Sequence, residues 1–432
     1  MNASEVKSTL SKYILADGID IVWDLDRSHG SQIFDAKSQK SFLDLFSFFA
    51  SQPIAFNHPK LATKEFKEKL GHFAIHRPSL SDVYTVEFAE AVDTFGRLAI
   101  RGHFDHLFFV EGGTLGVENA LKVAFDWKVR KNIANGVGEN GSKVIHFQKA
   151  FHGRSGYTLS LTNTADPRKH MYFPKFDWPR ISSPALTFPI NEASLAQVTQ
   201  LEERAIHEIE SALQNNPNDI AALIIEPIQA EGGDRHFRTE FLQTLRKLAD
   251  DHEFLLIFDE VQTGFGLTGT MWAFEQLGVK PDLISFGKKA QVAGCASTSR
   301  VDEVEKNVFH ESSRINSTWG GNLVDFMRVQ KYLEIIEEDG LVQNASLIGE
   351  HIVSELRDIA ESTGKISNVR GRGLMIAFDL PSTDTRNQVK QTMFNNGAMI
   401  LPCGEKSLRL RPHLDFTKED AAQALSIIKA SI

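Results

Sequence analysis

Short hydrophobic runs alternate with longer amphipathic segments through the middle of the chain. Between these runs, hydrophobic residues such as Val117, Leu121, Ala124 and Trp127 recur at helical spacing. This alternation is typical of an α/β protein, in which helices pack on a mainly parallel sheet. The runs predict five buried strands, at residues 106–110, 143–147, 221–225, 255–258 and 283–286.

The amino-terminal part of the chain follows a different pattern. Two alternating stretches, 19–24 and 31–35, predict short strands joined by turns. A phenylalanine-rich stretch over residues 42–56 predicts core rather than a binding site.

After residue 325 the pattern changes again. Two long amphipathic segments, 325–338 and 342–362, predict helices; short strands follow near 373–380, and a closing helix starts at Lys418. We therefore expect a large domain and a smaller α+β domain that uses both ends of the chain. The boundaries we predict are 1–57 for the amino-terminal segment, 58–325 for the large domain and 326–432 for the carboxyl-terminal part.

Composition and charge narrow the class of protein. A chain of 432 residues, 42% of them hydrophobic, can bury a large core. Its net charge of −9 argues against nucleic-acid binding, and Cys295 and Cys403 are too few for a disulfide framework. The first residues lack the hydrophobic core of a signal peptide, and no run reaches membrane-spanning length. We expect a cytoplasmic protein that contacts neither membrane nor nucleic acid.

Two predicted strands end in residues that carry chemistry. Asp259 ends one strand and Lys288 follows another, and ligands of open α/β sheets bind at this carboxyl edge. Because strand side chains alternate, Asp259 and Val261 share one side while Glu260 takes the other. A lysine near an acid is what a pyridoxal 5′-phosphate (PLP) Schiff base requires. The alternative is that both residues cap their strands and pair with each other.

Three further turns follow predicted strands. Glycines at 112–116 begin a helix, and such a turn offers backbone N–H groups to a phosphate. Phe151 could stack on one face of a pyridine ring while Val261 covers the other, with Arg154 near enough to meet an anion. Of the carboxylates at 226–231, we interpret Glu226 as structural. No histidine spacing indicates a metal site.

Together these residues resemble the class III PLP-dependent aminotransferases over essentially the whole chain. The resemblance implies fold type I, PLP as cofactor and a homodimer with active sites at its interface. Within the family, the chain looks closest to members that transfer the terminal amino group of L-lysine to 2-oxoglutarate, giving L-glutamate. The motifs that carry the resemblance are Glu111–Thr114, Phe151–Gly156, Asp259–Gly264, Gly287–Lys289 and Asn316–Asn322.

The resemblance also implies the roles of the cofactor-binding residues. Lys288 would form the Schiff base and move the proton between substrate and cofactor. Asp259 would pair with the pyridine nitrogen, and Gln262 would hydrogen-bond the phenolic oxygen. The phosphate would be held by Gly113 and Thr114, and by Thr318 of the neighbouring subunit.

The implied substrate contacts are carried by other residues. Arg409 would bind the carboxylate next to the reacting carbon of the keto acid, and Arg154 the distal carboxylate of either substrate. Glu231 could pair with Arg409 when lysine is bound and swing away for the keto acid, because a buried guanidinium facing methylenes is costly. Asn316 is the remaining expected substrate-binding residue.

Some alternatives stay open. Gly112 stands where the family commonly has serine, Leu267 where it often has arginine, and Lys289 opens a stretch that is usually glycine-rich. The lysine doublet leaves Lys289 as a second candidate for the Schiff base, although we favour Lys288. The amine donor could instead be ornithine, 4-aminobutyrate or a diamine, and the chain could be a PLP mutase, a decarboxylase or a non-catalytic protein.

Overall fold

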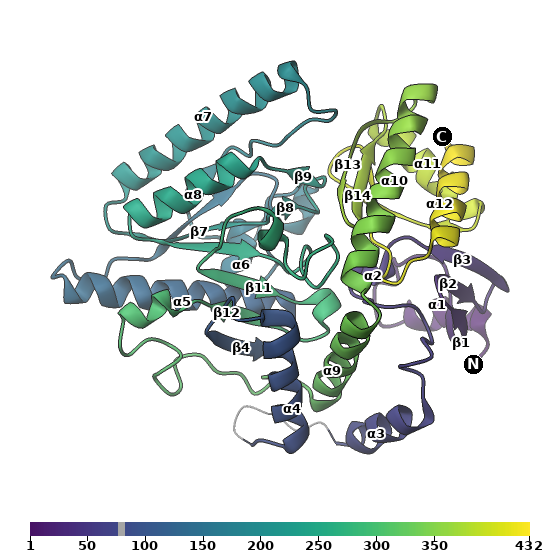
Figure 1. Cartoon of the computed structure of the whole chain (residues 1–432), viewed down its shortest axis with the longest axis horizontal. Coiled ribbons are helices and arrows are strands. Elements are labelled where there is room, and N and C mark those ends of the chain that lie inside the picture. The colour runs from purple at the N-terminus through teal and green to yellow at the C-terminus, as the bar shows by residue number, and fades with distance from the viewer. Residues whose placement is uncertain (77–82) are drawn as a thin grey trace.

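A seven-stranded sheet forms the centre of the protein (Figure 1). The computed structural model describes residues 1–76 and 83–432. In spatial order the strands of this sheet are β4 (His106–Val110), β12 (Ala293–Ser297), β11 (Leu283–Phe286), β10 (Leu255–Asp259), β7 (Ile220–Ile225), β5 (Lys143–Phe147) and β6 (Arg180–Ile181).

The five predicted strands are confirmed to within one residue, as β4, β5, β7, β10 and β11. The sequence did not predict β12, which runs antiparallel to both β11 and β4. Its residues are small because the neighbouring backbone lies so close. A Cβ at Gly294 would lie 1.9 Å from the carbonyl oxygen of Phe108. A strand of such residues lacks the hydrophobic contrast that sequence patterns rely on.

Helices cover both faces of the sheet. Helix α5 (Gly113–Ala134) packs on one face, where its hydrophobic residues join those of alternate strand positions. Helices α4 (Val86–Phe95), α7 (Glu192–Asn215) and α8 (Thr239–Asp251) contribute to the core on the other face. This two-sided burial explains why the strands are continuously hydrophobic, with every residue of β7 buried.

The carboxyl-terminal part stands beside this sheet (Figure 1). Its helices are α9 (Leu323–Glu338), α10 (Leu341–Thr363), α11 (Thr383–Asn395) and α12 (Lys418–Ser431). Its four-stranded sheet, in spatial order, contains β13 (Ser367–Arg372), β14 (Met375–Asp379), β17 (Ser407–Leu410) and β16 (Leu401–Cys403). The predicted helices 325–338 and 342–362 are confirmed as α9 and α10, and the closing helix as α12.

The amino-terminal strands belong to a sheet that both ends of the chain build. Strands β1 (Trp23–His29), β2 (Gln32–Asp35) and β3 (Lys40–Asp44) are followed in spatial order by β15 (Ala398–Met399). The first predicted strand is therefore misplaced, because pairing starts only at Trp23. The domain boundaries themselves stay a prediction.

Cys295 and Cys403 are both free and buried.

Short elements complete the described chain. The short elements include α1 (Val6–Leu10), α2 (Ser47–Ala50), α3 (Lys64–Ala74), α6 (Gly156–Leu161) and the pair β8 (Ile228–Gln229) and β9 (Arg235–His236).

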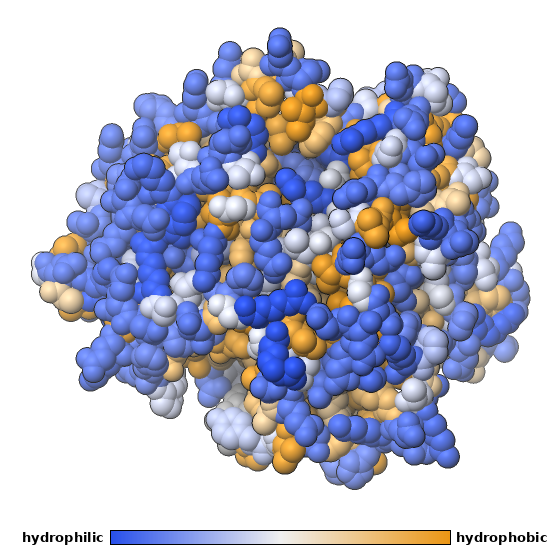
Figure 2. Space-filling view, viewed as in Figure 1, coloured by the Kyte–Doolittle hydropathy of each residue, from blue (hydrophilic) through white to orange (hydrophobic). Residues whose placement is uncertain are grey.

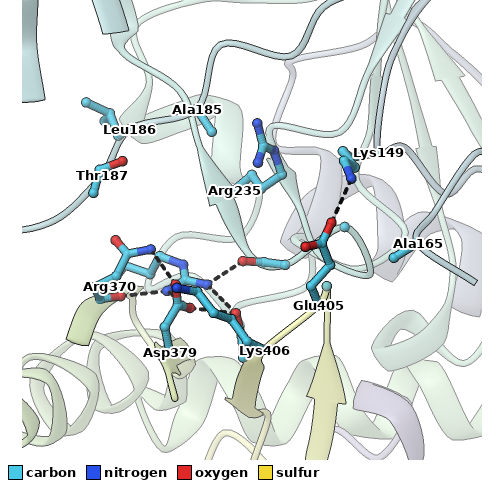
Figure 3. A pocket seen from close by; sticks show the side chains of 15 residues that line it. Lys149, Ala165, Ala185, Leu186, Thr187, Arg235, Arg370, Asp379, Glu405 and Lys406 are labelled. Carbon is cyan, nitrogen blue, oxygen red and sulfur yellow. Dashed lines mark hydrogen bonds and ion pairs between the residues drawn. The ribbon is translucent and has the colours of Figure 1, made fainter. Parts of the chain in front are cut away.

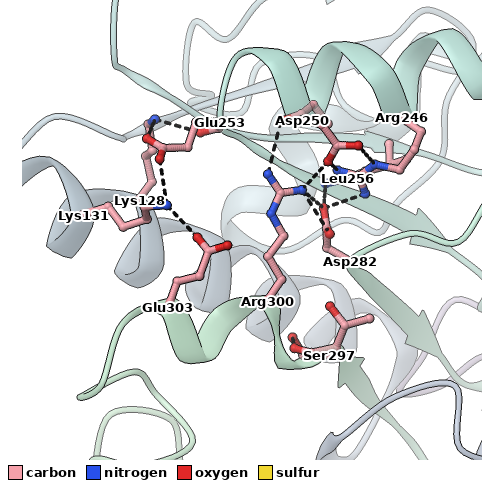
Figure 4. Close-up of polar contacts among 12 residues, drawn as sticks. Lys128, Lys131, Arg246, Asp250, Glu253, Leu256, Asp282, Ser297, Arg300 and Glu303 are labelled. Atoms are coloured by element: carbon pink, nitrogen blue, oxygen red, sulfur yellow. Dashed lines mark hydrogen bonds and ion pairs between the residues drawn. The ribbon is translucent and has the colours of Figure 1, made fainter.

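A polar network closes the amino edge of the sheet, opposite the strand ends described below (Figure 4). Asp282, which precedes β11, accepts a 2.7 Å hydrogen bond from the backbone N–H of Leu256. It also forms ion pairs with Arg246 and Arg300. Nearby, Lys128 of α5 donates to the backbone carbonyl of Glu253. These contacts tie α5 and α8 to the amino ends of β10 and β11.

The face shown in Figure 2 is mostly hydrophilic, with separate hydrophobic patches. One patch lies at its lower edge, where Figure 1 places α4 and α9. Over residues 1–76 and 83–432, none of the helices combines the length and the hydrophobicity that crossing a membrane requires.

Candidate active site

A cavity of about 180 Å³ lies at the carboxyl edge of β10 and β11. Most of the predicted cofactor residues line it, although they come from four separate stretches of the chain. The lining residues are Gly113, Thr114, Phe151, His152, Gly153, Glu226, Glu231, Asp259, Val261, Gln262 and Lys288.

Asp259, the last residue of β10, presents a buried carboxylate to this cavity. Its Oδ1 accepts hydrogen bonds from the Ser285 hydroxyl at 2.9 Å and the Val261 backbone N–H at 3.1 Å, while His152 Nδ1 lies 2.7 Å from Oδ2. Burial by itself lowers the pKa of His152, but the hydrogen bond and charge of Asp259 outweigh burial and raise that pKa. The carboxylate is thus oriented by three donors, of which the sequence suggested none.

Glu260 lies on the other side of the strand, as the alternation predicts. Its carboxyl group accepts hydrogen bonds from the backbone N–H groups of Ala273 and Phe274, and from the hydroxyl of Thr263. Burial raises its pKa to about 7. Glu260 therefore fixes the turn after β10 and does not line the cavity.

Lys288 follows β11 in a strained backbone conformation. Its φ of +50° lies in the left-handed region, which residues other than glycine rarely adopt. Its Nζ donates a 3.2 Å hydrogen bond to the backbone carbonyl of Phe49. Burial, together with the positive charges of Arg409 and Arg411, lowers the pKa of Lys288 to about 8. A much larger share of this amine is therefore uncharged near neutral pH than of an ordinary lysine.

Lys289 is buried and points elsewhere. Its Nζ donates to the Ser47 hydroxyl and to the backbone carbonyls of Gln52 and Pro412, at 2.8 to 3.2 Å. Burial lowers its pKa to about 7. Lys289 joins three segments of the chain and does not line the cavity, so the geometry favours Lys288 of the doublet.

Helix α5 begins at the cavity. Gly113 is its first residue and Gly112 its N-cap, with a φ of +91° that side chains rarely allow. A Cβ at Gly113 would lie 2.8 Å from Cγ1 of Val261, so only glycine leaves room here. Backbone N–H groups at the positive end of a 22-residue helix suit a phosphate. Thr114 adds a hydroxyl, as the sequence predicts.

Gln262 is held by an arginine that the sequence analysis overlooked. Arg411 is fully buried, pairs with Asp234, and donates a 3.3 Å hydrogen bond to the side-chain oxygen of Gln262. This contact uses the side-chain oxygen of Gln262 as an acceptor, and the NH₂ group is the donor that Gln262 can offer to a ligand. Arg411 could have been found from the strand alternation, because it lies two residues after Arg409.

Glu226 connects two of the loops that line the cavity. Its carboxyl oxygens accept hydrogen bonds from the backbone N–H groups of Phe151, at 2.9 Å, and Ala230, at 3.1 Å. Burial and the charge of Asp259 outweigh the charge of His152 and raise the pKa of Glu226 to about 7. This geometry agrees with the structural role that the sequence analysis gave to Glu226.

Glu231 separates the buried guanidinium of Arg409 from the cavity. Arg409 is on β17, in the carboxyl-terminal part, and its Nη2 lies 3.0 Å from Oε2 of Glu231. Its Nε and Nη1 are buried without a hydrogen-bond partner within the described part of the chain. Two N–H groups in this state can receive a carboxylate once Glu231 moves aside.

Lys169 is a second cation on Glu231. It ends a 3₁₀ turn, Pro167–Lys169, and its Nζ contacts Oε1 of Glu231. The same Nζ lies 5.9 Å from the centre of the Phe151 ring. No periodicity or motif marks Lys169 in the sequence, because an irregular loop brings it to the site.

Besides Arg409, three predicted substrate or cofactor residues do not line this cavity. Arg154 is exposed, although its neighbour Gly153 is a lining residue. Asn316 and Thr318 are also exposed, on the loop that precedes α9. The roles of these residues stay predictions.

A second cavity, of about 220 Å³, lies behind the Glu231 loop (Figure 3). It is lined by Gly232 and Gly233 on one side and by residues of the carboxyl-terminal sheet on the other. Arg370 crosses this seam: it pairs with Asp379 at 2.9 Å and donates to the backbone carbonyls of Gly233 and Asp234. These contacts fix the sheet that carries Arg409 against the loop that carries Glu231.

One group of possible metal ligands lies away from the site. His106, Asp302 and His310 place ligand atoms within 4.8 Å of one another. His106 is at the start of β4, whereas the cavity lies beyond the end of that strand. Asp302 already accepts hydrogen bonds from His106, at 2.9 and 3.0 Å.

Comparison with known proteins identifies the family. A family model described as aminotransferase class-III matches residues 14–432. The chain belongs to the class-III aminotransferases. It is 46% identical to the L-lysine-epsilon aminotransferases of Mycobacterium tuberculosis, over 99% of this chain and 95% of that one, and of Streptomyces clavuligerus, over 100% and 95%. The structure of a lysine aminotransferase from M. tuberculosis, in the internal aldimine form, superposes with a TM-score of 0.97 at 46% identity, covering 100% of this chain and 99% of that one.

Class-III aminotransferases are PLP-dependent, and the cavity fits this cofactor. The Gly113 turn leaves room at a positive helix end, as a phosphate requires. Asp259 offers a buried acceptor for a protonated ring nitrogen, and Lys288 offers an amine of lowered pKa. The fold of this class-III aminotransferase is therefore the type I fold that the sequence predicts.

Proposed function

We propose that this enzyme transfers the ε-amino group of L-lysine to 2-oxoglutarate, giving 2-aminoadipate 6-semialdehyde and L-glutamate. The aldehyde then cyclises to piperideine-6-carboxylate. The observation that carries the proposal is Glu231 held on the buried guanidinium of Arg409 at the cavity wall. A site in which the arginine is paired with a glutamate suits a donor whose reacting end has methylenes and no carboxylate. The 46% identity to lysine-epsilon aminotransferases supports the same donor.

The residues of the site would divide the chemistry among them. PLP supplies a carbon that accepts the amino group and a ring that withdraws electrons from the substrate. Lys288, with its lowered pKa, is suited to take a proton from the terminal carbon of the donor and return it on the cofactor side. Asp259, oriented by His152 and Ser285, would keep the ring nitrogen protonated.

The remaining residues would position the cofactor and the two substrates. Gln262 would donate its amide to the phenolic oxygen, while Phe151 and Val261 would enclose the ring. When 2-oxoglutarate replaces lysine, Glu231 would leave Arg409, whose unpartnered N–H groups would then bind the carboxylate. Arg154 would hold the distal carboxylate of either substrate, and Asn316 would be a further substrate-binding residue.

We also propose a cytoplasmic homodimer. Thr318 lies on an exposed loop, beside Trp319, whose backbone carbonyl accepts a 3.1 Å hydrogen bond from the N–H of Glu111. Large hydrophobic side chains such as Tyr84, Val86 and Trp319 are 46 to 74% exposed. A second copy that covers them would bring its own Thr318 to the phosphate end of the cavity.

The proposal is tested by offering the purified holoenzyme different amines with 2-oxoglutarate. We expect glutamate and a cyclic imine, trapped with an aromatic amino-aldehyde, from L-lysine. Turnover with ornithine, 4-aminobutyrate or a diamine in place of lysine would keep the family and reject the donor. Borohydride reduction before peptide mapping should place the pyridoxyl group on Lys288; a label on Lys289 would overturn the assignment of the reactive lysine.

A further inference from the structure

The carboxylate of Glu231 bridges two cations through different oxygens. Oε1 contacts Nζ of Lys169, and Oε2 lies 3.0 Å from Nη2 of Arg409. One contact can therefore break while the other remains. The backbone of Glu231 is fixed separately, because its carbonyl accepts a 2.9 Å hydrogen bond from the N–H of Gly404. Any movement away from Arg409 is thus left to the side chain.

Lys169 is the nearest available counter-charge for such a movement. Its neighbour Arg168 pairs with Asp166 at 2.8 Å, so Lys169 is the cation of this turn that reaches Glu231. The side chain of Lys169 is 25% exposed, compared with 5% for Arg409. Lys169 is thus closer to solvent than Arg409.

We propose that Lys169 is the residue that holds Glu231 when the carboxylate of 2-oxoglutarate or glutamate occupies Arg409. This inference rests on the proposed function, because it needs a site that alternates between a terminal amine and an amino or keto acid. With lysine bound, Glu231 keeps Arg409 as a partner even without Lys169. With a dicarboxylate bound, the substrate occupies Arg409. Of the two cations that form ion pairs with Glu231 in the described part of the chain, Lys169 then remains.

Lys169 is accordingly a positioning residue that distinguishes the two half-reactions. Without Lys169, binding of a dicarboxylate would leave the Glu231 carboxylate unpaired next to the negative charge of the substrate. Because Glu231 is partly buried, an unpaired charge there is costly. Lysine binding would lose only the weaker, more exposed of two ion pairs.

The test compares the two half-reactions in Lys169→Met. We expect the KM for glutamate and for 2-oxoglutarate to rise about fivefold to tenfold, with the KM for lysine changed less than twofold and kcat nearly constant. Binding of glutarate, a dicarboxylate that cannot react, should weaken by the same factor in a calorimetric titration. Lys169→Arg should restore the KM for glutamate, the KM for 2-oxoglutarate and the affinity for glutarate.

Two controls separate this role from a general effect on the loop. Arg168→Met removes a charge from the same turn without touching Glu231, and should behave as the unaltered enzyme. In a Glu231→Gln background there is no charge to hold, so adding Lys169→Met should then change the glutamate KM less than twofold.

The outcomes distinguish this inference from the assignment of the donor. If the enzyme processes glutamate but not lysine, the proposed donor is wrong, and the glutamate and glutarate measurements still decide the role of Lys169. Unchanged glutamate KM and glutarate affinity in Lys169→Met would overturn the inference. Equal losses in both half-reactions, or no rescue by arginine, would overturn it as well.

Discussion

At the scale of residues, the site works through groups whose charge is set by their neighbours. Lys288 has a pKa lowered to about 8 by burial and by Arg409 and Arg411. Glu231 has its pKa held below the ordinary value, because Arg409 and Lys169 outweigh its burial. Near neutral pH, Lys288 therefore has a larger uncharged fraction than an ordinary lysine, while Glu231 stays charged. A base whose pKa lies close to neutrality is suited to proton transfer from a substrate carbon.

Replacing Glu231 with alanine should impair one half-reaction more than the other. Without the carboxylate, the guanidinium of Arg409 faces the methylenes of lysine unpaired, at a cost of about 1 to 3 kcal/mol, or roughly fivefold to 150-fold in kcat/KM. Glutamate brings its own carboxylate and should lose much less. Single-turnover absorbance measurements with each donor would show the difference. Equal losses with both donors would contradict the switch.

At the scale of elements, the first turn of α5 and the ends of β10 and β11 form one unit. A Cβ on Gly113 would approach Val261 to 2.8 Å, and a Cβ on Gly116 would lie 2.6 Å from the backbone carbonyl of Gly294 on β12. The helix can therefore lie against the strands only with glycine at both places. This close approach brings the positive helix end within reach of the cavity that Lys288 lines.

Gly113→Ala should therefore weaken PLP binding. The added methyl group must displace the stiff Val261 side chain or the helix start, and about tenfold lower affinity is expected for a displacement costing roughly 1.4 kcal/mol. Titration of apo-protein with PLP, followed by absorbance, gives the affinity. Gly71→Ala is the matched control, because Gly71 lies in α3 with no atom within 4 Å of the added Cβ. Equal affinities in both variants would show that the helix start tolerates the methyl group.

At the scale of the whole molecule, the site needs several parts of the chain and, in our proposal, a second copy. The seven-stranded sheet supplies Asp259 and Lys288, and the carboxyl-terminal sheet supplies Arg409. Arg370 ties these parts together through Asp379 and the backbone of the Glu231 loop. In this proposal, each subunit contributes its exposed loop with Thr318 to the active site of the neighbouring subunit.

Mixed dimers of two inactive variants test this arrangement. If Thr318 acts across the interface, a dimer of Lys288→Ala with Thr318→Ala contains one site with both native residues and one site with neither. We expect about half of the native activity at limiting PLP, well above that of either parent dimer. Activity no greater than that of the parents would place Thr318 in its own subunit's site.

Local sequence patterns predicted most of this site, because strand ends and strand-to-helix turns are short-range features. Asp259, Lys288, Gly113, Thr114, Phe151 and Val261 meet in the cavity for that reason, whereas Gln262 was expected from the family resemblance alone. Lys169 could not be predicted, since an irregular loop positions it through packing of distant segments. Strand β12 was missed because small residues carry no hydrophobic signal, although close backbone packing demands them.

Leu43 on β3 pairs with Ala398 on β15, although about 350 residues of chain separate them. Since the ribosome delivers the amino end first, β3 lacks this partner until Met399 has been added to the chain. The seven-stranded sheet has all its strands once Ser297 has emerged, and can assemble much earlier. Until β15 has been synthesised, the sheet of β1, β2 and β3 therefore keeps an open edge at β3, with which other nascent chains could pair.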